Sequence, residues 1–248
     1  PNNLPFSNLA GEGFENRLAA MLAADLKADL KYVWWAERRS FLKNSLNADL
    51  CDVVMGVPST LDTVRTTTPY YHSTYVFVER TGRNPRVSSL TDPELARLKI
   101  GIHLVGSDYA PPAHLLARQG IAGQLVGYSL YGPVDAPNPP SQIIDAVARG
   151  DVDVAIVWGP FAGYFSGRQQ IPLTITPVSP PAFQAIPFTY GISAAVRKAD
   201  LALRDEIEQV FARECKQIAA LLAEYRFPLV QEDSAPCGSS PSAAAFLH

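Results

Sequence analysis

Ser107 is the first side chain to consider for chemistry, because it lies in a short Gly-Ser-Asp loop after a predicted strand. A serine nucleophile needs a general base held beside it, and the sequence offers no good candidate for that base. The backbone N–H groups of such a loop can instead hold an anion at the start of a helix. We therefore interpret Gly106 and Ser107 as a turn, with anion binding as the alternative, and predict no catalytic role.

His103 ends the strand before this loop, where it could face a ligand. The other histidines, His72, His114 and His248, have no metal-ligand spacing with it. No phosphate-binding glycine motif, zinc motif or calcium loop occurs in the sequence. We favour a structural histidine whose hydrogen bonds are satisfied, and we predict no metal and no cofactor.

Trp158 is the residue that the surrounding pattern singles out. A helical segment ends at Gly150, an alternating run of β-branched residues follows, and this run stops at Trp158-Gly159-Pro160 before a new helix. In open α/β sheets, ligands bind outside the carboxyl ends of the strands. Trp158 and Gly159 are therefore expected to face a cleft.

The composition restricts the classes of protein to consider. The chain has 248 residues, of which 47% are hydrophobic and 18% are charged, and its net charge is -3 at pH 7. No apolar run approaches the roughly 18 residues of a membrane span. No basic stripe is present that would neutralise the phosphates of a nucleic acid. These features indicate a globular protein that neither crosses a membrane nor binds nucleic acid.

Helical and strand patterns alternate along most of the chain, with crossovers long enough for parallel strands. The apolar periodicity and the Gly and Pro positions predict helices over 14–27, 41–47, 92–98 and 139–149, a helix beginning at 111, and an interrupted helical region over 203–225. Strands are predicted over 31–35, 52–58, 99–103, 124–128, 152–157 and 173–178.

Two long extended stretches, 70–79 and 187–196, interrupt this rhythm and enclose a complete βα series. This arrangement predicts an α/β fold with two lobes, in which the chain crosses to the second lobe and returns. The first lobe comprises 1–75 and 188–248, and the second comprises 76–187. A loosely held tail is expected over 231–248. Two crossings form a hinge with a cleft between the lobes, and a single continuous sheet would contradict this expectation.

Phrases along the whole chain resemble the bilobal periplasmic solute-binding proteins of type 2, in particular those that bind polar amino acids. They include Gly13-Phe14-Glu15, Cys51-Asp52-Val53-Val54, Thr68-Pro69-Tyr70-Tyr71, Lys99-Ile100-Gly101-Ile102 and Gly150-Asp151-Val152-Asp153. In that family an arginine holds the ligand carboxylate and an aspartate holds its ammonium. The resemblance places Thr60 and Trp158 at these two positions. Losing one partner of a buried charge pair costs about 2 to 5 kcal/mol, so we reject capture of free amino acids.

A narrower resemblance covers residues 1 to about 228. The phrases are Pro1-Asn2-Asn3-Leu4-Pro5-Phe6-Ser7-Asn8, Trp34-Trp35, Pro69-Tyr70-Tyr71-His72-Ser73-Thr74-Tyr75, Asn138-Pro139-Pro140 and Val157-Trp158-Gly159-Pro160. They are similar to the solute-binding-like proteins associated with quinoprotein dehydrogenases, the MxaJ/XoxJ type, and the opening phrase is closer to the XoxJ members.

The narrower resemblance implies a periplasmic accessory protein, not an enzyme, that helps to activate or mature a pyrroloquinoline-quinone (PQQ) methanol dehydrogenase, here the lanthanide-dependent one. It also implies a signal peptide before residue 1 and, in the same preceding segment, a cysteine that could pair with Cys51. The partner would be the catalytic subunit of the dehydrogenase. A transporter binding protein for a small solute other than an amino acid remains an alternative, and a dehydratase-like enzyme on the same fold is another.

The expected cleft gathers residues from strand ends and loops of both lobes. They are Asn3, Val57, Pro58, Thr60, Tyr75, His103, Gly106, Ser107, Trp158 and Gly159. We expect further aromatic side chains around it, namely Tyr70, Tyr71, Tyr131, Phe161 and Tyr164. Aromatic residues are enriched at protein interfaces, which favours a protein partner. A peptide in the cleft and binding on an outer face both remain open.

Three cysteines occur in the chain. Cys215 and Cys237 flank a helix end and a tail rich in proline and serine, where a disulfide would join the two. We predict this pairing, with two unrelated thiols as the alternative. Cys51 is then unpaired within these residues.

Overall fold

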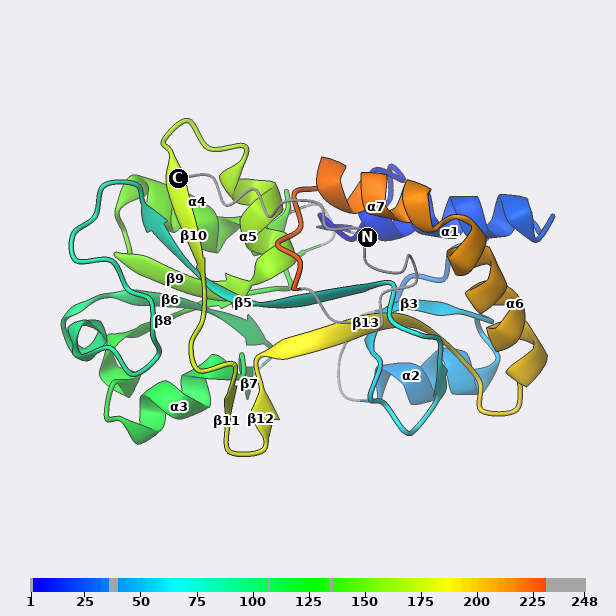
Figure 1. Cartoon of the computed structure of the whole chain (residues 1–248), viewed down its shortest axis with the longest axis horizontal. Helices are drawn as coiled ribbons and strands as arrows, with labels where there is room; N and C mark the ends of the chain where they lie inside the picture. The colour runs from blue at the N-terminus through cyan, green and yellow to red at the C-terminus, as the bar shows by residue number, and fades with distance from the viewer. Residues whose placement is uncertain (1, 36–39, 107, 134–135, 231–248) are drawn as a thin grey trace.

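The computed structural model describes residues 2–35, 40–106, 108–133 and 136–230, and it has two bodies side by side (Figure 1). The predicted tail over 231–248 lies outside the described residues. We use the predicted bounds to name the lobes, and these bounds stay a prediction. In Figure 1 the second lobe, with α3, α4 and α5, lies to the left of the first lobe, with α1, α2, α6 and α7.

The helices follow the predicted segments closely. The α-helices are α1 (Phe14–Asp25), α2 (Phe41–Asn44), α3 (Pro112–Arg118), α4 (Gln142–Arg149), α5 (Gly159–Ser166), α6 (Leu201–Arg213) and α7 (Cys215–Glu224). Short 3₁₀ helices are η1 (Leu46–Ala48), η2 (Pro93–Arg97), η3 (Ala122–Gln124) and η4 (Pro139–Ser141). Gly150 ends α4 with φ +83°, a conformation that costs glycine little. The Asp92 side chain caps η2 by accepting a hydrogen bond from the Glu94 N–H.

The strands lie mostly where the sequence predicts them. They are β1 (Asn2–Asn3), β2 (Ser7–Asn8), β3 (Val54–Pro58), β4 (Arg65–Thr66), β5 (Tyr71–Arg80), β6 (Ile100–Val105), β7 (Asp108–Tyr109), β8 (Leu125–Ser129), β9 (Val154–Trp158), β10 (Leu173–Pro177), β11 (Ala182–Phe183), β12 (Ile186–Pro187) and β13 (Thr189–Val196). The predicted strand over 31–35 is wrong, because these residues form neither helix nor strand. Tyr32 and Trp35 are exposed there.

Strand β5 joins the two lobes. Its first residues, Tyr71 to Thr74, pair with β13, whereas Tyr75 to Glu79 pair with β9. One hydrogen-bonded path therefore runs β3-β13-β5-β9-β6-β7. The statement that a single continuous sheet would contradict two lobes is therefore wrong, because β5 is long enough to pair within both halves. The bilobal α/β fold itself is confirmed, and Figure 1 shows β5 and β13 passing between the two bodies.

The largest hydrophobic core also spans both lobes. It contains Phe14, Leu18 and Ile207 from the first lobe, and Ile143 and Phe165 from the second. A separate cluster lies mostly within the second lobe, around buried residues that include Leu90, Leu95 and Leu116. It also contains Phe188, which is the first residue of the predicted return to the first lobe. The junction between the lobes is thus partly a packed interior.

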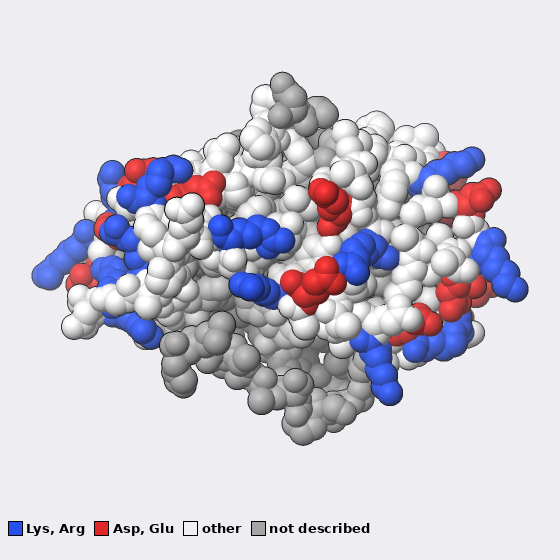
Figure 2. Space-filling model, turned by 90° about the horizontal axis from the view of Figure 1, so that it is seen from above, with Lys and Arg blue, Asp and Glu red and all other residues white. Residues whose placement is uncertain are grey.

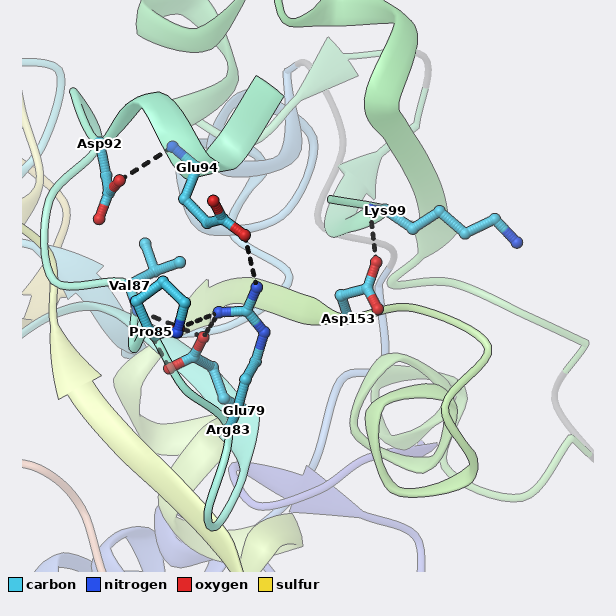
Figure 3. Close-up of polar contacts among 8 residues, drawn as sticks. All are labelled: Glu79, Arg83, Pro85, Val87, Asp92, Glu94, Lys99 and Asp153. Carbon is cyan, nitrogen blue, oxygen red and sulfur yellow. Dashed lines mark hydrogen bonds and ion pairs between the residues drawn. The ribbon is translucent and has the colours of Figure 1, made fainter. Parts of the chain in front are cut away.

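The far end of β5 is fixed by a buried carboxylate (Figure 3). Glu79 is 2% exposed; it forms an ion pair with Arg83 at 3.0 Å and accepts the Val87 N–H at 3.3 Å. Arg83 also lies 3.6 Å from Glu94. Burial raises the pKa of Glu79, and Val87 and Arg83 oppose this rise. These contacts hold the loop after β5 against the second lobe.

Charged side chains of both signs are interspersed on the face above α5 and α7 (Figure 2). They lie mainly toward the two ends of this face, with a small mixed group in the middle. No stripe of one charge crosses the part of this face that the structure describes. Among the described residues, no helix is both long enough and apolar enough to cross a membrane.

Candidate functional site

Three aromatic side chains meet where β5 changes partner. Tyr75 of β5 lies opposite Trp158 of β9, and their ring centroids are 5.5 Å apart with the planes at 62°. Tyr190 of β13 also contacts Trp158, with the ring centroids 5.8 Å apart and the planes at 70°. All three side chains are partly buried. We call Tyr75, Trp158 and Tyr190 the aromatic trio.

The aromatic trio is electrically neutral at physiological pH. Burial raises the pKa of Tyr75, and the nearby Tyr190 raises it further. Burial also raises the pKa of Tyr190, whose hydroxyl donates a hydrogen bond to the Pro187 carbonyl at 2.9 Å. The trio therefore offers ring faces and neutral hydroxyl groups, and no carboxylate, at the position where the resemblance would place an aspartate.

His103, expected in the cleft, is buried. Its side chain is 2% exposed and packs edge-on against Phe161 at 5.2 Å. Burial lowers its pKa to about 4, so the ring is neutral at pH 7. The Nε2 atom lies 3.3 Å from the Pro140 carbonyl oxygen, and a carbonyl can only accept, so this nitrogen carries the proton. The interpretation of His103 as a structural histidine fits this geometry.

Gly159 and Val57 are buried as well. Gly159 begins α5, and a Cβ atom built on it would lie 2.7 Å from the Ser73 Oγ and 2.8 Å from the Thr74 carbonyl oxygen. Val57 is 4% exposed and packs in a small core of the first lobe. Neither residue offers surface to a ligand, because each is enclosed by neighbouring strands or by the core.

The remaining cleft residues are more accessible. Asn3 and Pro58 are partly buried, whereas Thr60 and Gly106 are exposed. Ser107 lies outside the described residues. That these residues line one cleft stays a prediction.

Four of the aromatic residues expected around the cleft belong to the shared core. Tyr70 and Tyr71 are each 3% exposed, Phe161 is 5% and Tyr164 is 7% exposed. The expectation that they line a cleft between the lobes was wrong, because these rings are buried against other core rings. Tyr70 and Tyr71 pack on Phe14, Phe161 packs on Phe6, and Tyr164 packs on Tyr225. Tyr131 is partly buried.

Asn2 makes a contact between the lobes that the sequence did not reveal. Its side-chain amide donates to the Pro133 carbonyl at 2.9 Å and to the Ala136 carbonyl at 3.1 Å. The turn-like Asn2-Asn3 pair was the only signal, and it does not indicate a partner so distant in sequence. Asn2 is therefore a candidate for holding the N-terminal residues of the first lobe against the second lobe.

Two hollows among the described residues have linings that include no residue of the aromatic trio. One of about 300 Å³ lies between α5 and α7 and is lined by Glu12, Tyr164, Arg168, Glu224 and Tyr225. Another of about 440 Å³ is lined by Asp145, Ala148, Arg149, Arg168, Gln169, Gln170 and Ile171. Among the described residues, no group of His, Cys, Asp and Glu could hold a metal ion.

Two cysteines lie within the described residues, and each has the bonding state that the sequence predicted. Cys215 is disulfide-bonded and Cys51 is a free thiol. Burial raises the pKa of Cys51, which disfavours the reactive thiolate. Cys237 lies outside the described residues, so its pairing with Cys215 stays a prediction.

No family model matches the sequence. Two curated relatives carry the name MoxJ. The protein from Paracoccus denitrificans is 31% identical over 91% of this chain and 85% of its own length. The protein from Methylorubrum extorquens is 30% identical over 91% of this chain and 78% of its own length. The chain belongs to the MoxJ family. It is thus a periplasmic binding protein of the MxaJ/XoxJ type, as the phrases in the sequence predicted.

Two solved structures place this MoxJ-family protein within the type. MxaJ from Methylophaga aminisulfidivorans superposes with a TM-score of 0.79, at 25% identity, over 92% of this chain and 96% of that one. The periplasmic binding protein XoxJ from Methylobacterium extorquens AM1 gives 0.75, at 30% identity, over 94% and 97%. Structure favours MxaJ and sequence favours XoxJ, so the two are not separated.

Proposed function

We propose that this protein is a non-catalytic periplasmic accessory protein of methanol oxidation. It binds the catalytic subunit of a PQQ-dependent methanol dehydrogenase, of the lanthanide type, and helps the enzyme to become active. Membership of the MoxJ family supports this role, and the description of the related XoxJ as a periplasmic binding protein supports the location. The lobe bounds of 1–75 plus 188–248 and 76–187 are part of the same proposal.

The aromatic trio is the observation that carries the proposal. A zwitterionic ligand that leaves water needs a partner for each of its charges, and truncating one partner of a buried pair costs about 2 to 5 kcal/mol. Trp158 contacts the rings of Tyr75 and Tyr190. Thr60, at the position of the expected arginine, is exposed and uncharged. These two positions do not form a clamp for a free amino acid.

A surface of aromatic rings suits a protein partner better than a small polar solute. Tyr and Trp contribute large contact areas and dominate the binding energy of protein interfaces. The Tyr190 hydroxyl, whose proton is donated to the Pro187 carbonyl, can still accept a hydrogen bond from a backbone N–H of the partner. We therefore infer that a segment of the dehydrogenase contacts Trp158.

The experiment compares the intact protein with two tryptophan variants. Trp158→Ala removes the centre of the trio, and the matched control Trp35→Ala removes an exposed tryptophan outside it. Binding to the purified dehydrogenase, in its cofactor-free and holo forms, is measured by biolayer interferometry, together with enzyme activity. A central interface tryptophan contributes about 2 kcal/mol or more, so we expect Trp158→Ala to weaken binding by about 30-fold or more.

Three results would contradict the proposal. If the intact protein neither binds the enzyme nor changes its activity, the function is wrong. If Trp158→Ala and Trp35→Ala behave alike, the interface lies on another face. If calorimetry with small organic acids and other solutes finds micromolar binding, the transporter alternative replaces it.

A further inference from the structure

The chain leaves helix α7 by a sharply defined turn. The Arg226 N–H donates to the Ala223 carbonyl, and the Phe227 N–H donates to the Leu222 carbonyl, which together form a Schellman motif. Arg226 occupies the left-handed position of this motif, with φ +57°. The turn directs residues 226–230 away from the helix and toward the junction of the lobes, where Figure 1 shows them in red. We call these residues the 226–230 segment.

The 226–230 segment lies along β5 at the crossing point. Ser73 forms an antiparallel bridge with Leu229, and the Val230 N–H donates to the His72 carbonyl at 3.0 Å. The Ser73 Oγ donates to the Pro228 carbonyl at 2.6 Å. The segment thus takes the edge of β5 immediately before the residues that pair with β9. It is a third stretch of chain at the hinge, in addition to β5 and the chain leading into β13.

Helix α5 of the second lobe meets the same segment backbone to backbone. Gly163 is buried, and a Cβ atom built on it would lie 1.8 Å from the Arg226 carbonyl oxygen and 3.2 Å from the Pro228 Cδ. At Gly159 the same construction reaches 3.3 Å from the Pro228 Cγ. Only glycine allows so close an approach. One face of α5 is therefore shaped to receive the segment.

Aromatic rings on both sides of this contact are buried between the lobes. Tyr164 of α5 stacks on Tyr225 of the first lobe, with centroids 5.7 Å apart and planes at 14°. Phe161 of α5 packs on Phe6 at 5.1 Å, and Phe6 packs on Phe227 at 5.9 Å. These rings continue into the core that both lobes share.

We propose that the 226–230 segment and α5 lock the two lobes at one angle, so that the protein does not open and close around a ligand. A hinge rotation would have to move α5 along the Arg226 backbone, where the space at Gly163 does not admit even a Cβ atom. It would also have to separate the stacked rings of Tyr164 and Tyr225. Packed interfaces change between discrete arrangements and do not deform continuously. With the lobes held at one angle, the three rings of the aromatic trio keep fixed positions relative to one another. This proposal does not depend on whether the partner is a dehydrogenase.

The angle between the lobes is measured directly by spin labels. Asn47→Cys in the first lobe and Ala96→Cys in the second introduce exposed labelling sites. A Cys51→Ser background removes the free thiol, and Cys215 is disulfide-bonded. Double electron–electron resonance on the otherwise intact protein is expected to give one narrow distance distribution. A broad or two-peaked distribution would overturn the lock.

Variants test whether α5 and the segment cause the rigidity. Gly163→Val forces α5 away from the Arg226 carbonyl, so the distance distribution should shift and broaden. The matched control is Gly123→Ala, because a Cβ atom there meets nothing within 4 Å. Tyr164→Ala, which removes the stack but adds no bulk, is expected to broaden the distribution if Gly163→Val does not fold. An unchanged distribution in a folded Gly163→Val or in Tyr164→Ala would contradict the proposal.

Discussion

His103 shows how burial decides the role of a titratable side chain. It sits at a strand end, where a ligand-binding histidine could also lie, but the 2% exposed ring packs on Phe161 and meets the Pro140 carbonyl. The sequence favoured a structural role because no other histidine was suitably spaced. It could not identify the enclosing residues, because Pro140 is 37 residues away along the chain.

The lowered pKa of His103 predicts a pH dependence of stability. Its folded pKa of about 4 lies below the value of 6.5 expected for an accessible histidine. The unfolded chain therefore binds more protons between these pH values, and acid favours unfolding. The contribution is fully present above pH 6.5 and is lost as the pH falls toward 4. At 1.36 kcal/mol per pKa unit it amounts to roughly 3 kcal/mol.

This prediction is checked by urea unfolding at several pH values between 4 and 7. His103→Gln should flatten the decrease of the unfolding free energy over this range, because glutamine does not titrate. The control is His114→Gln, since His114 is exposed. Equal pH slopes for the native protein and His103→Gln would show that other groups cause the effect.

At the scale of elements, the sequence predicted most helices and strands but not their partners. Hydrophobic periodicity located α1, α4, β6 and β9 within a few residues, since each must bury one face or both. The residues over 31–35 have strand composition but lack a strand partner in the structure. The sequence placed Tyr164 in the helical segment after Trp158, but it did not show that this side chain packs on Tyr225 of the other lobe. The error over the cleft aromatics has this origin.

The loop after β5 gives a prediction about a buried charge. Arg83 is the ion-pair partner of Glu79, and removing one partner of a buried pair leaves an uncompensated charge that costs about 3 to 5 kcal/mol. Because Arg83 is 18% exposed, we expect Arg83→Met to destabilise the protein by about 2 to 4 kcal/mol. Glu79→Gln should cost less, since the amide oxygen can still accept from Val87.

Chemical denaturation of the two single variants and of the Arg83→Met/Glu79→Gln double variant tests this coupling. The double variant should be more stable than Arg83→Met alone, because it no longer buries an unpaired carboxylate. Arg149→Met serves as the control: Arg149 forms a pair with Asp151 in which both side chains are more than half exposed, and such pairs contribute about 0 to 1 kcal/mol. Strictly additive effects would show that Glu79 and Arg83 do not act as a pair.

For the whole molecule, the shared core and the continuous path of strands imply that the lobes depend on each other. The sequence indicated two lobes because it contains two crossings and a complete βα series between them. It did not indicate the packing of Phe6 on Phe161 and Phe227, which come from three distant segments of the chain. Contacts of this kind depend on tertiary geometry, and local patterns do not encode them.

The last prediction is that both lobes unfold in one cooperative transition. Leu18 of the first lobe and Ile143 of the second are fully buried in the same core, and truncating such a side chain to alanine costs about 2 to 5 kcal/mol. In scanning calorimetry, Leu18→Ala and Ile143→Ala should each lower the Tm of a single peak. The exposed Leu201, changed to alanine as the control, should leave the Tm nearly unchanged. Two peaks, of which each variant moves only one, would mean that the lobes fold independently and that the contacts at the junction contribute little to stability.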